Sequence, residues 1–174
     1  KYEQTRHNAG FLAIDRLAEK RGASIKKMKF HALTGEAEIS GERCLLLKPL
    51  TFMNLSGEAV EEASQFYKIP PERILVLFDD ISLDPGRLRI RRKGSDGGHN
   101  GMKNIIYLSG SDQFPRIKLG VGQKPHPDYN LADWVLSRFS EQEREALETA
   151  FQNAAAASEL IAKGEIDRAM SLYN

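Results

Sequence analysis

The chain has 174 residues, of which 41% are hydrophobic and 28% are charged, proportions that suit one soluble globular domain. The net charge of +1 gives no strong overall attraction to a polyanion, and no apolar run approaches the ~20 residues that span a membrane. Cys44 is the only cysteine, which excludes an internal disulfide, and the N-terminus lacks a signal-peptide pattern. We therefore expect a cytoplasmic protein without a membrane partner.

Helical and strand patterns alternate along the chain, which predicts an α/β fold. The first pattern is an amphipathic helix with Asn8 as a candidate N-cap and a stop near Gly22. Two strands follow, at 29–39 and 43–48, joined by a short hairpin turn. A second helix is expected after Ser56.

The second half starts with a continuously apolar strand at 74–78, typical of a central strand that is covered on both faces. Asp79-Asp80 follow it directly. Arginines then alternate with Leu88 and Ile90, which predicts a strand with one basic face near the edge of a sheet. Next come a glycine-rich turn at 94–101 and a short helix.

The C-terminal part is predicted to contain a strand at 116–121 and an exposed loop at 122–130. Ser140 and Glu143 form a capping-box pattern at the start of a long final helix. Gly164 is the expected end of that helix.

Four polar clusters lie at predicted element ends, where side chains can converge above a sheet. They are Thr5 to Asn8, Phe52 to Asn54, Asp79-Asp80 and His99-Asn100. A lone histidine such as His7 is more often structural, but an imidazole is a useful base near neutral pH when a carboxylate orients it. Asp79 fits that role or a simple turn, and Asp80 competes for it.

The segment of Phe52, Met53 and Asn54 fits either packing with a helix cap or binding of an RNA 3′ end, by stacking and an amide hydrogen bond. Gly97 to Gly101 fits a tight turn or an anion site at a helix start. The sequence has no P-loop, dinucleotide-binding or zinc-ligand spacing, so we expect no cofactor and no metal.

A local basic surface is predicted from Arg87 to Lys93. Arginines on one face of a strand are most often simply solvated. With a phosphate partner, Arg91, Arg116 and Lys118 would instead hold an RNA backbone without reading its sequence.

In combination, these clusters resemble the bacterial peptidyl-tRNA hydrolase family. The resemblance covers nearly the whole chain and keeps the family's order and spacing. It rests on Tyr2 with Thr5-Arg6-His7-Asn8-Ala9-Gly10, on Pro49 to Gly57, on Asp79-Asp80 before Leu83 to Gly86, and on Gly97-Gly98-His99-Asn100-Gly101. It implies a single α/β domain over 1–174, with a twisted mixed β-sheet flanked by helices.

The resemblance also implies an activity, which is hydrolysis of the ester between a peptide and the 3′ end of tRNA. His7 would be the general base and Asp79 would stabilise its productive form. The substrate-binding and tRNA-binding residues would be Tyr2, Phe52, Met53, Asn54, His99, Asn100, Arg91 and Lys118. Arg91 and Lys118 would hold the 5′ phosphate. We expect a monomer whose partner is the acceptor stem and 3′ end of peptidyl-tRNA.

One feature of the family has no counterpart in this sequence. The family begins with an apolar strand that ends in a Gly-x-Asn-Pro-Gly-like turn, and no such residues precede Lys1. We therefore expect that N-terminal sequence is missing. Two other classes stay open: a non-catalytic RNA-binding module, and a peptidase of related architecture that would cut amides with little salt dependence.

Overall fold

The computed structural model describes residues 4–174, so Tyr2 lies outside the described residues. Its α-helices are α1 (Ala9–Lys20), α2 (Ser56–Tyr67), α3 (Asn100–Ser109), α4 (Leu131–Val135), α5 (Glu141–Ala162) and α6 (Ile166–Tyr173). Its strands are β1 (Lys27–Lys29), β2 (Ala32–Ile39), β3 (Glu42–Pro49), β4 (Val76–Asp80), β5 (Leu88–Arg91) and β6 (Arg116–Gly120). Single 3-10 turns are η1 (Arg6–Asn8), η2 (Met53–Leu55) and η3 (Pro71–Arg73).

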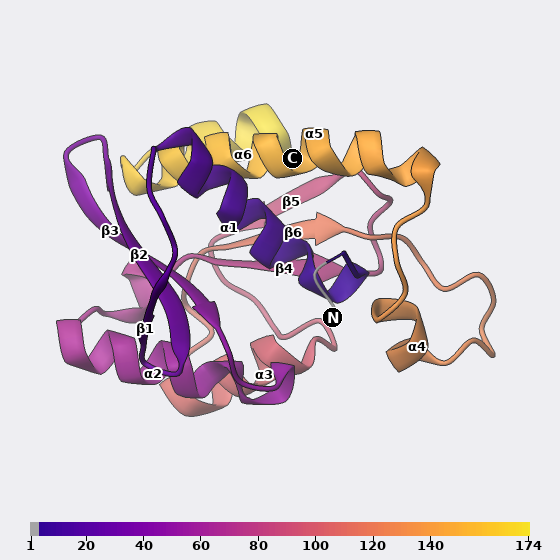
Figure 1. The fold of residues 1–174 in the computed structure, drawn as a ribbon, viewed down its shortest axis with the longest axis horizontal. Coiled ribbons are helices and arrows are strands. Elements are labelled where there is room, and N and C mark those ends of the chain that lie inside the picture. Colours follow the sequence, from indigo (N-terminus) through magenta and orange to yellow (C-terminus); the bar gives the residue numbers. More distant parts are fainter. Residues whose placement is uncertain (1–3) are drawn as a thin grey trace.

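The strands form two three-stranded sheets between layers of helices (Figure 1). The sheet β1-β2-β3 is antiparallel throughout. In the sheet β4-β6-β5, β4 and β6 are parallel and β5 and β6 are antiparallel. The predicted α/β class with a mixed sheet is confirmed, although the first three strands form a sheet of their own. The predicted edge position of the arginine-rich strand β5 is also confirmed.

The position of β4 corrects the sequence-based prediction of a central strand. Within the described residues, β4 lies at the edge of its sheet, and a cavity of about 890 Å³ separates it from β3. Ile74 to Leu77 line this cavity and are only half-buried. Among the described residues β4 pairs with β6 alone, and its apolar side chains line the cavity instead of meeting a second strand.

The predicted strand 29–39 is also wrong at its start, because it contains a hairpin turn. Phe30 and His31 have φ values of 58° and 55°, the left-handed conformation that tight hairpins require. Glycine or asparagine normally signals such a turn. Here Phe30 is buried instead, with its ring 5.4 Å from that of Phe66 and 5.8 Å from that of Tyr67, and this packing offsets the backbone strain.

The predicted helices are present, but α4 (Leu131–Val135) was not predicted, and two further details differ. The capping box of Ser140 and Glu143 at the start of α5 is confirmed. However, α5 is not the final helix, since it ends before Gly164 and α6 follows. The Asn174 side chain exchanges two hydrogen bonds with the backbone of Ile90, which ties the C-terminal end to β5. Asn8 stands at the N-cap of α1, but its side chain does not make the capping hydrogen bond.

The main core lies where α1, α5 and α6 pack on one face of the β4-β6-β5 sheet. A Cβ atom on Gly10 of α1 would lie only 2.2 Å from the Leu77 carbonyl oxygen of β4. Glycine therefore allows a close approach of helix and strand, and this approach brings η1 beside the end of β4. Within residues 4–174, no helix combines the length and the apolar character needed to cross a lipid bilayer.

Candidate active site

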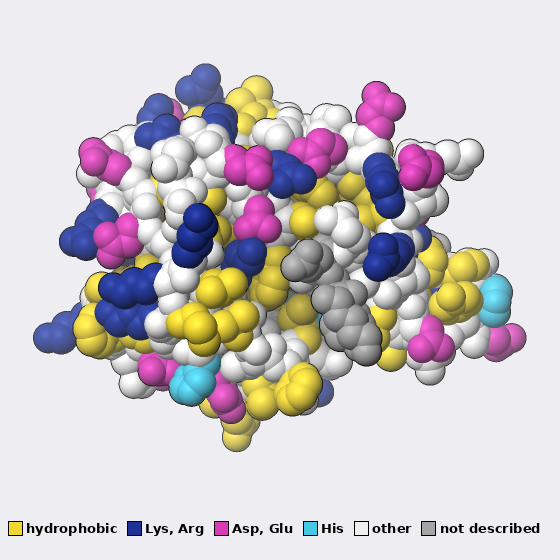
Figure 2. All heavy atoms as spheres, viewed as in Figure 1, with side chains coloured by type: hydrophobic (Ala, Val, Ile, Leu, Met, Phe, Trp, Pro, Cys, Tyr) yellow, Lys and Arg dark blue, Asp and Glu magenta, His cyan; other side chains and the backbone are white. Residues whose placement is uncertain are grey.

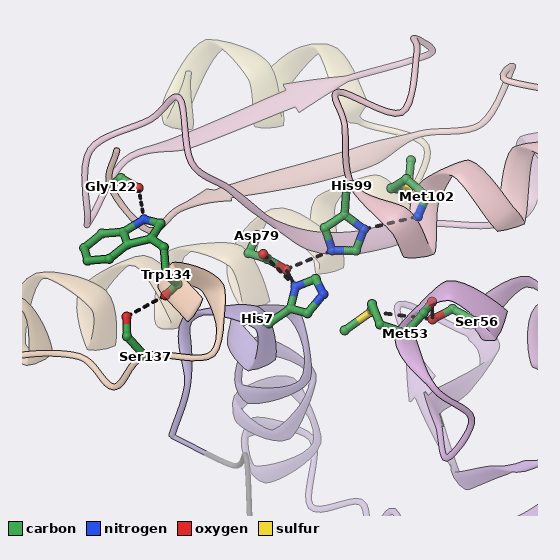
Figure 3. Close-up of polar contacts among 9 residues, drawn as sticks. All are labelled: His7, Met53, Ser56, Asp79, His99, Met102, Gly122, Trp134 and Ser137. Atoms are coloured by element: carbon green, nitrogen blue, oxygen red, sulfur yellow. Dashed lines mark hydrogen bonds and ion pairs between the residues drawn. The ribbon is translucent and has the colours of Figure 1, made fainter. Parts of the chain in front are cut away.

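The site is built around His7 on η1 and Asp79 near the end of β4 (Figure 3). The Nδ1 atom of His7 lies 2.9 Å from Oδ2 and 3.1 Å from Oδ1 of Asp79. A carboxylate only accepts hydrogen bonds, so Nδ1 carries a proton, and Nε2 of the neutral ring keeps its lone pair. In Figure 3 this second nitrogen points away from Asp79. The two residues predicted to form a catalytic pair are thus in contact.

Asp79 is held as a carboxylate although it is buried, with a relative exposure of 5%. Burial by itself raises the pKa of this carboxyl. Hydrogen bonds from His7 and His99 outweigh that effect, and the net result is a pKa of Asp79 well below its ordinary value. The competing residue, Asp80, has a different role, because its Oδ1 accepts hydrogen bonds from the N–H and Oγ of Ser82 and so stabilises the turn.

His99 lies against the same carboxylate. Its Nε2 is 2.9 Å from Asp79 Oδ1, and its Nδ1 accepts a hydrogen bond of 3.2 Å from the backbone N–H of Met102. The His99 side chain is therefore the N-cap of α3. Sequence analysis missed this role, since histidine is not among the common N-cap residues.

His7, Asp79 and His99 also satisfy a distance test for a metal site, because one ligand atom from each lies within 4.8 Å of the others. The hydrogen bonds oppose metal binding. The Met102 N–H fixes Nδ1 of His99 as an acceptor, so the proton of the neutral ring is on Nε2. A protonated nitrogen cannot ligate a metal, and a metal would first have to break the cap of α3.

Arg6, next to His7, anchors η1 to the C-terminal half of the chain. Its Nη2 atom lies 2.9 Å from Glu143 Oε1, and its guanidinium lies 3.8 Å from the centre of the Trp134 ring. Trp134 is fixed in turn, because its indole N–H donates to the Gly122 carbonyl oxygen (Figure 3). A partly buried ion pair and a cation–π contact thus hold the segment that carries His7.

The remaining predicted substrate-binding residues near this pair differ in exposure. Phe52 is 81% exposed, and Asn54 and Asn100 are exposed with no side-chain hydrogen bond to any residue in 4–174. Asn54 does not cap α2, whose N-cap is Leu55. Met53 is half-buried, and its sulfur packs beside Gly101 of α3. Three of the four are therefore accessible, and Met53 contributes to packing.

Of the three residues predicted to bind phosphate, Arg91 and Lys118 lie together and Arg116 is buried. Arg91 on β5 and Lys118 on β6 lie on one face of adjacent strands, as diagonal neighbours in the register. Arg116 is different, because it is fully buried and its guanidinium donates to the carbonyl oxygens of Gly94, Ser95, Asp112 and Phe114. The prediction that Arg116 holds phosphate is therefore wrong.

Charge is otherwise mixed on the surface. On the face in Figure 2, acidic and basic side chains are interspersed along the upper edge of the molecule, and the net charge is only +1. The predicted anion site at the glycine-rich turn also has an acidic neighbour, since Asp96 Oδ1 accepts from the Gly98 N–H at 2.7 Å. Attraction for a polyanion must come from a local set such as Arg91 and Lys118.

Comparison with known proteins agrees with this geometry. A family model described as peptidyl-tRNA hydrolase matches residues 1–174. The peptidyl-tRNA hydrolase of Agathobacter rectalis is 54% identical over 100% of this chain and 94% of its own length. The peptidyl-tRNA hydrolase of Caldanaerobacter subterraneus subsp. tengcongensis is 51% identical over 99% of this chain and 92% of its own length. The crystal structure of peptidyl-tRNA hydrolase from Acinetobacter baumannii superposes with a TM-score of 0.92 at 36% identity, over 98% of this chain and 86% of that one.

The similarity spans the helices and strands that bring His7, Asp79 and His99 together. The sequence identities are far above the level at which two proteins share only a fold. The chain therefore belongs to the peptidyl-tRNA hydrolase family, whose members release tRNA from peptidyl-tRNA.

Proposed function

We propose that this chain hydrolyses the ester between a peptide, or an N-blocked aminoacyl group, and the 3′ end of tRNA, with His7 as general base. The supporting observation is the contact between His7 Nδ1 and Asp79 at 2.9 Å, which leaves the Nε2 lone pair directed away from the carboxylate. A base needs such a free lone pair and a pKa suited to neutral pH, which imidazole offers.

In this mechanism, His7 Nε2 takes a proton from water as the water oxygen attacks the ester carbonyl carbon. Asp79 stabilises the imidazolium that forms, because its carboxylate is already deprotonated and hydrogen-bonded to Nδ1. The tetrahedral intermediate then collapses, and the proton passes from Nε2 to the departing ribose oxygen. No covalent enzyme intermediate is needed.

The exposed amides of Asn54 and Asn100 are proposed to orient the substrate and to donate hydrogen bonds to its carbonyl oxygens. Phe52, which is 81% exposed, would stack on the terminal base or on the adjoining peptide. Each of these groups is accessible without a rearrangement of the core.

Arg91 and Lys118 are proposed to bind the 5′ phosphate of the tRNA. Lys118 on β6 lies opposite Phe78 of β4, and Phe78 directly precedes Asp79. Arg91 and Lys118 therefore lie on the same sheet as the catalytic carboxylate. The contacts would be to phosphate, and recognition would not depend on the sequence of the acceptor stem. We further propose that the enzyme works as a monomer in the cytoplasm, where translation takes place.

The test is release of a labelled N-acetyl-aminoacyl group from tRNA by the parent chain and its His7→Ala variant. We expect a loss of roughly 10²- to 10⁴-fold in kcat, the usual contribution of a general base. His31→Ala is the matched control, since that imidazole is exposed and pairs with Glu62 away from the site.

The alternatives predict different results. A non-catalytic RNA-binding module would bind tRNA equally well with or without His7 and would cleave nothing. A peptidase would cut a matching peptide amide faster than the tRNA ester. Full activity of His7→Ala on the ester would contradict the proposed base.

A further inference from the structure

We propose that His99 is a positioning residue for the catalytic pair and does not bind the substrate. In this arrangement, the first turn of α3 orients His99, and His99 in turn holds the Asp79 carboxylate against His7. The inference rests on the proposed role of His7 as general base. Its tests include one that does not depend on activity.

Both nitrogens of the His99 ring already make hydrogen bonds within the protein. Nδ1 accepts from the Met102 N–H at 3.2 Å, and Nε2 donates to Asp79 Oδ1 at 2.9 Å. A neutral imidazole has one donor and one acceptor, so no hydrogen-bonding capacity is left for a substrate. The side chain is also more enclosed than that of His7, with relative exposures of 8% and 17%.

The His99 ring is also held by the residues packed around it. Phe78, the neighbour of Asp79 on β4, meets the His99 ring edge-on at 5.2 Å between centroids. On the side of α3, a Cβ atom on Gly101 would lie 2.9 Å from His99 Cε1 and 3.2 Å from Nδ1. The ring is therefore packed between the buried Phe78 side chain and Gly101, whose lack of a side chain leaves room for it.

The hydrogen bonds of His99 and His7 converge on the Asp79 carboxylate (Figure 3). The Met102 N–H is always a donor, so it assigns the His99 proton to Nε2. That proton is donated to Asp79 Oδ1, which holds the carboxylate with its Oδ2 at 2.9 Å and its Oδ1 at 3.1 Å from His7 Nδ1. Because the carboxylate only accepts, His7 keeps its proton on Nδ1 and its lone pair on Nε2, and the position of the carboxylate orients the His7 ring.

His99→Asn separates capping from positioning. Asparagine is a good N-cap, so it should keep the Met102 hydrogen bond, but it is too short to reach Asp79 as well. We expect a melting temperature and a KM close to those of the parent chain, and a kcat lower by about 10- to 100-fold, the range for loss of one hydrogen bond to a buried charge. His99→Ala should show the same reduction in kcat and also a lower melting temperature, because alanine cannot cap α3.

Gly101→Ala is a second variant that keeps every functional group. Alanine suits the backbone of α3, since Gly101 has no positive φ, but its methyl group would displace the His99 ring. We expect a folded protein with a reduced kcat. Unchanged kcat in both His99→Asn and Gly101→Ala would overturn the proposal, as would a His99→Asn variant that raises KM and leaves kcat unchanged, because that result indicates substrate binding.

Nitrogen-15 NMR of the imidazole rings tests the arrangement without substrate. In the parent chain, the neutral His99 ring should carry its proton on Nε2 and the His7 ring on Nδ1. In His99→Asn, Asp79 loses one of the donors that position it, so the signal of the His7 Nδ1–H group should shift or broaden. A His99 ring protonated on Nδ1 would refute the positioning role. Should His7→Ala prove fully active while these tautomers are found, the general-base proposal fails and the hydrogen-bond arrangement stands.

Discussion

Replacing Asp79 with asparagine keeps the shape of the side chain, removes its negative charge and turns one of its two acceptors into a donor. His99 is committed by Met102 to donate from Nε2, so the new amide oxygen must take the Oδ1 position, 2.9 Å from His99. The NH₂ group then occupies the Oδ2 position, 2.9 Å from His7 Nδ1, and donates to it. His7 must become an acceptor at Nδ1 and carry its proton on Nε2, where a base needs a lone pair.

We therefore expect Asp79→Asn to lower kcat roughly 10²- to 10⁴-fold, as for loss of a general base, with little change in KM. The assay is single-turnover release of N-acetyl-aminoacyl groups from tRNA at saturating enzyme. Asp80→Asn is the matched control, because Asp80 bonds Ser82 in the turn and does not contact His7. An Asp79→Asn variant with parental kcat, or one impaired only in KM, would refute this reasoning.

Three further predictions concern packing, tRNA binding and pH. Gly10→Ala should lower the free energy of unfolding by about 1–3 kcal/mol or more in chemical denaturation, because the new Cβ would lie 2.2 Å from a carbonyl oxygen of β4. Arg91→Ala and Lys118→Ala should each raise KM for tRNA substrates and lower the slope of log affinity against log salt by about 0.7–0.9 per lost phosphate contact. Lys27→Ala on β1 should not change that slope. For pH, the pKa of Asp79 is lower in the folded state than its ordinary value of 3.8, so its contribution to stability is complete above that pH and is lost as the pH falls further. Acid unfolding of Asp79→Asn should therefore depend less on pH in that range.

Each of these has a contradicting outcome. Parental stability of Gly10→Ala would mean that α1 and β4 are farther apart than the structure has them. An unchanged salt slope in both basic variants would place the 5′ phosphate elsewhere. Identical acid unfolding curves for the parent chain and Asp79→Asn would contradict the lowered pKa of Asp79.

Much of the fold could be predicted from local sequence. The capping box of Ser140 and Glu143 and the alternation on β5 are local patterns with direct structural causes. The turn at Phe30-His31 could not be predicted, because ring packing replaces the usual glycine there. The edge position of β4 was equally hidden, since an apolar run does not report strand pairing.

The site was predicted as a set of residues but not as a geometry. The contact of His7 with Asp79 joins residues 72 positions apart, which only a resemblance could suggest. The buried roles of His99 and Arg116 are set by backbone groups of Met102, Gly94 and others, which have no signature in the side-chain sequence. The roles of these side chains depend on contacts with distant parts of the chain, which local sequence patterns do not predict.

Chemical rescue of His7→Ala tests the central claim most directly. That variant keeps Asp79 and His99 and leaves space for a free imidazole beside the carboxylate. If His7 is the base, added imidazole should raise the rate of N-acetyl-aminoacyl-tRNA hydrolysis with a saturable dependence on its unprotonated form, and His31→Ala should show no such response. A His7→Ala variant that binds the substrate normally but hydrolyses it at one rate, with or without imidazole, would contradict the account.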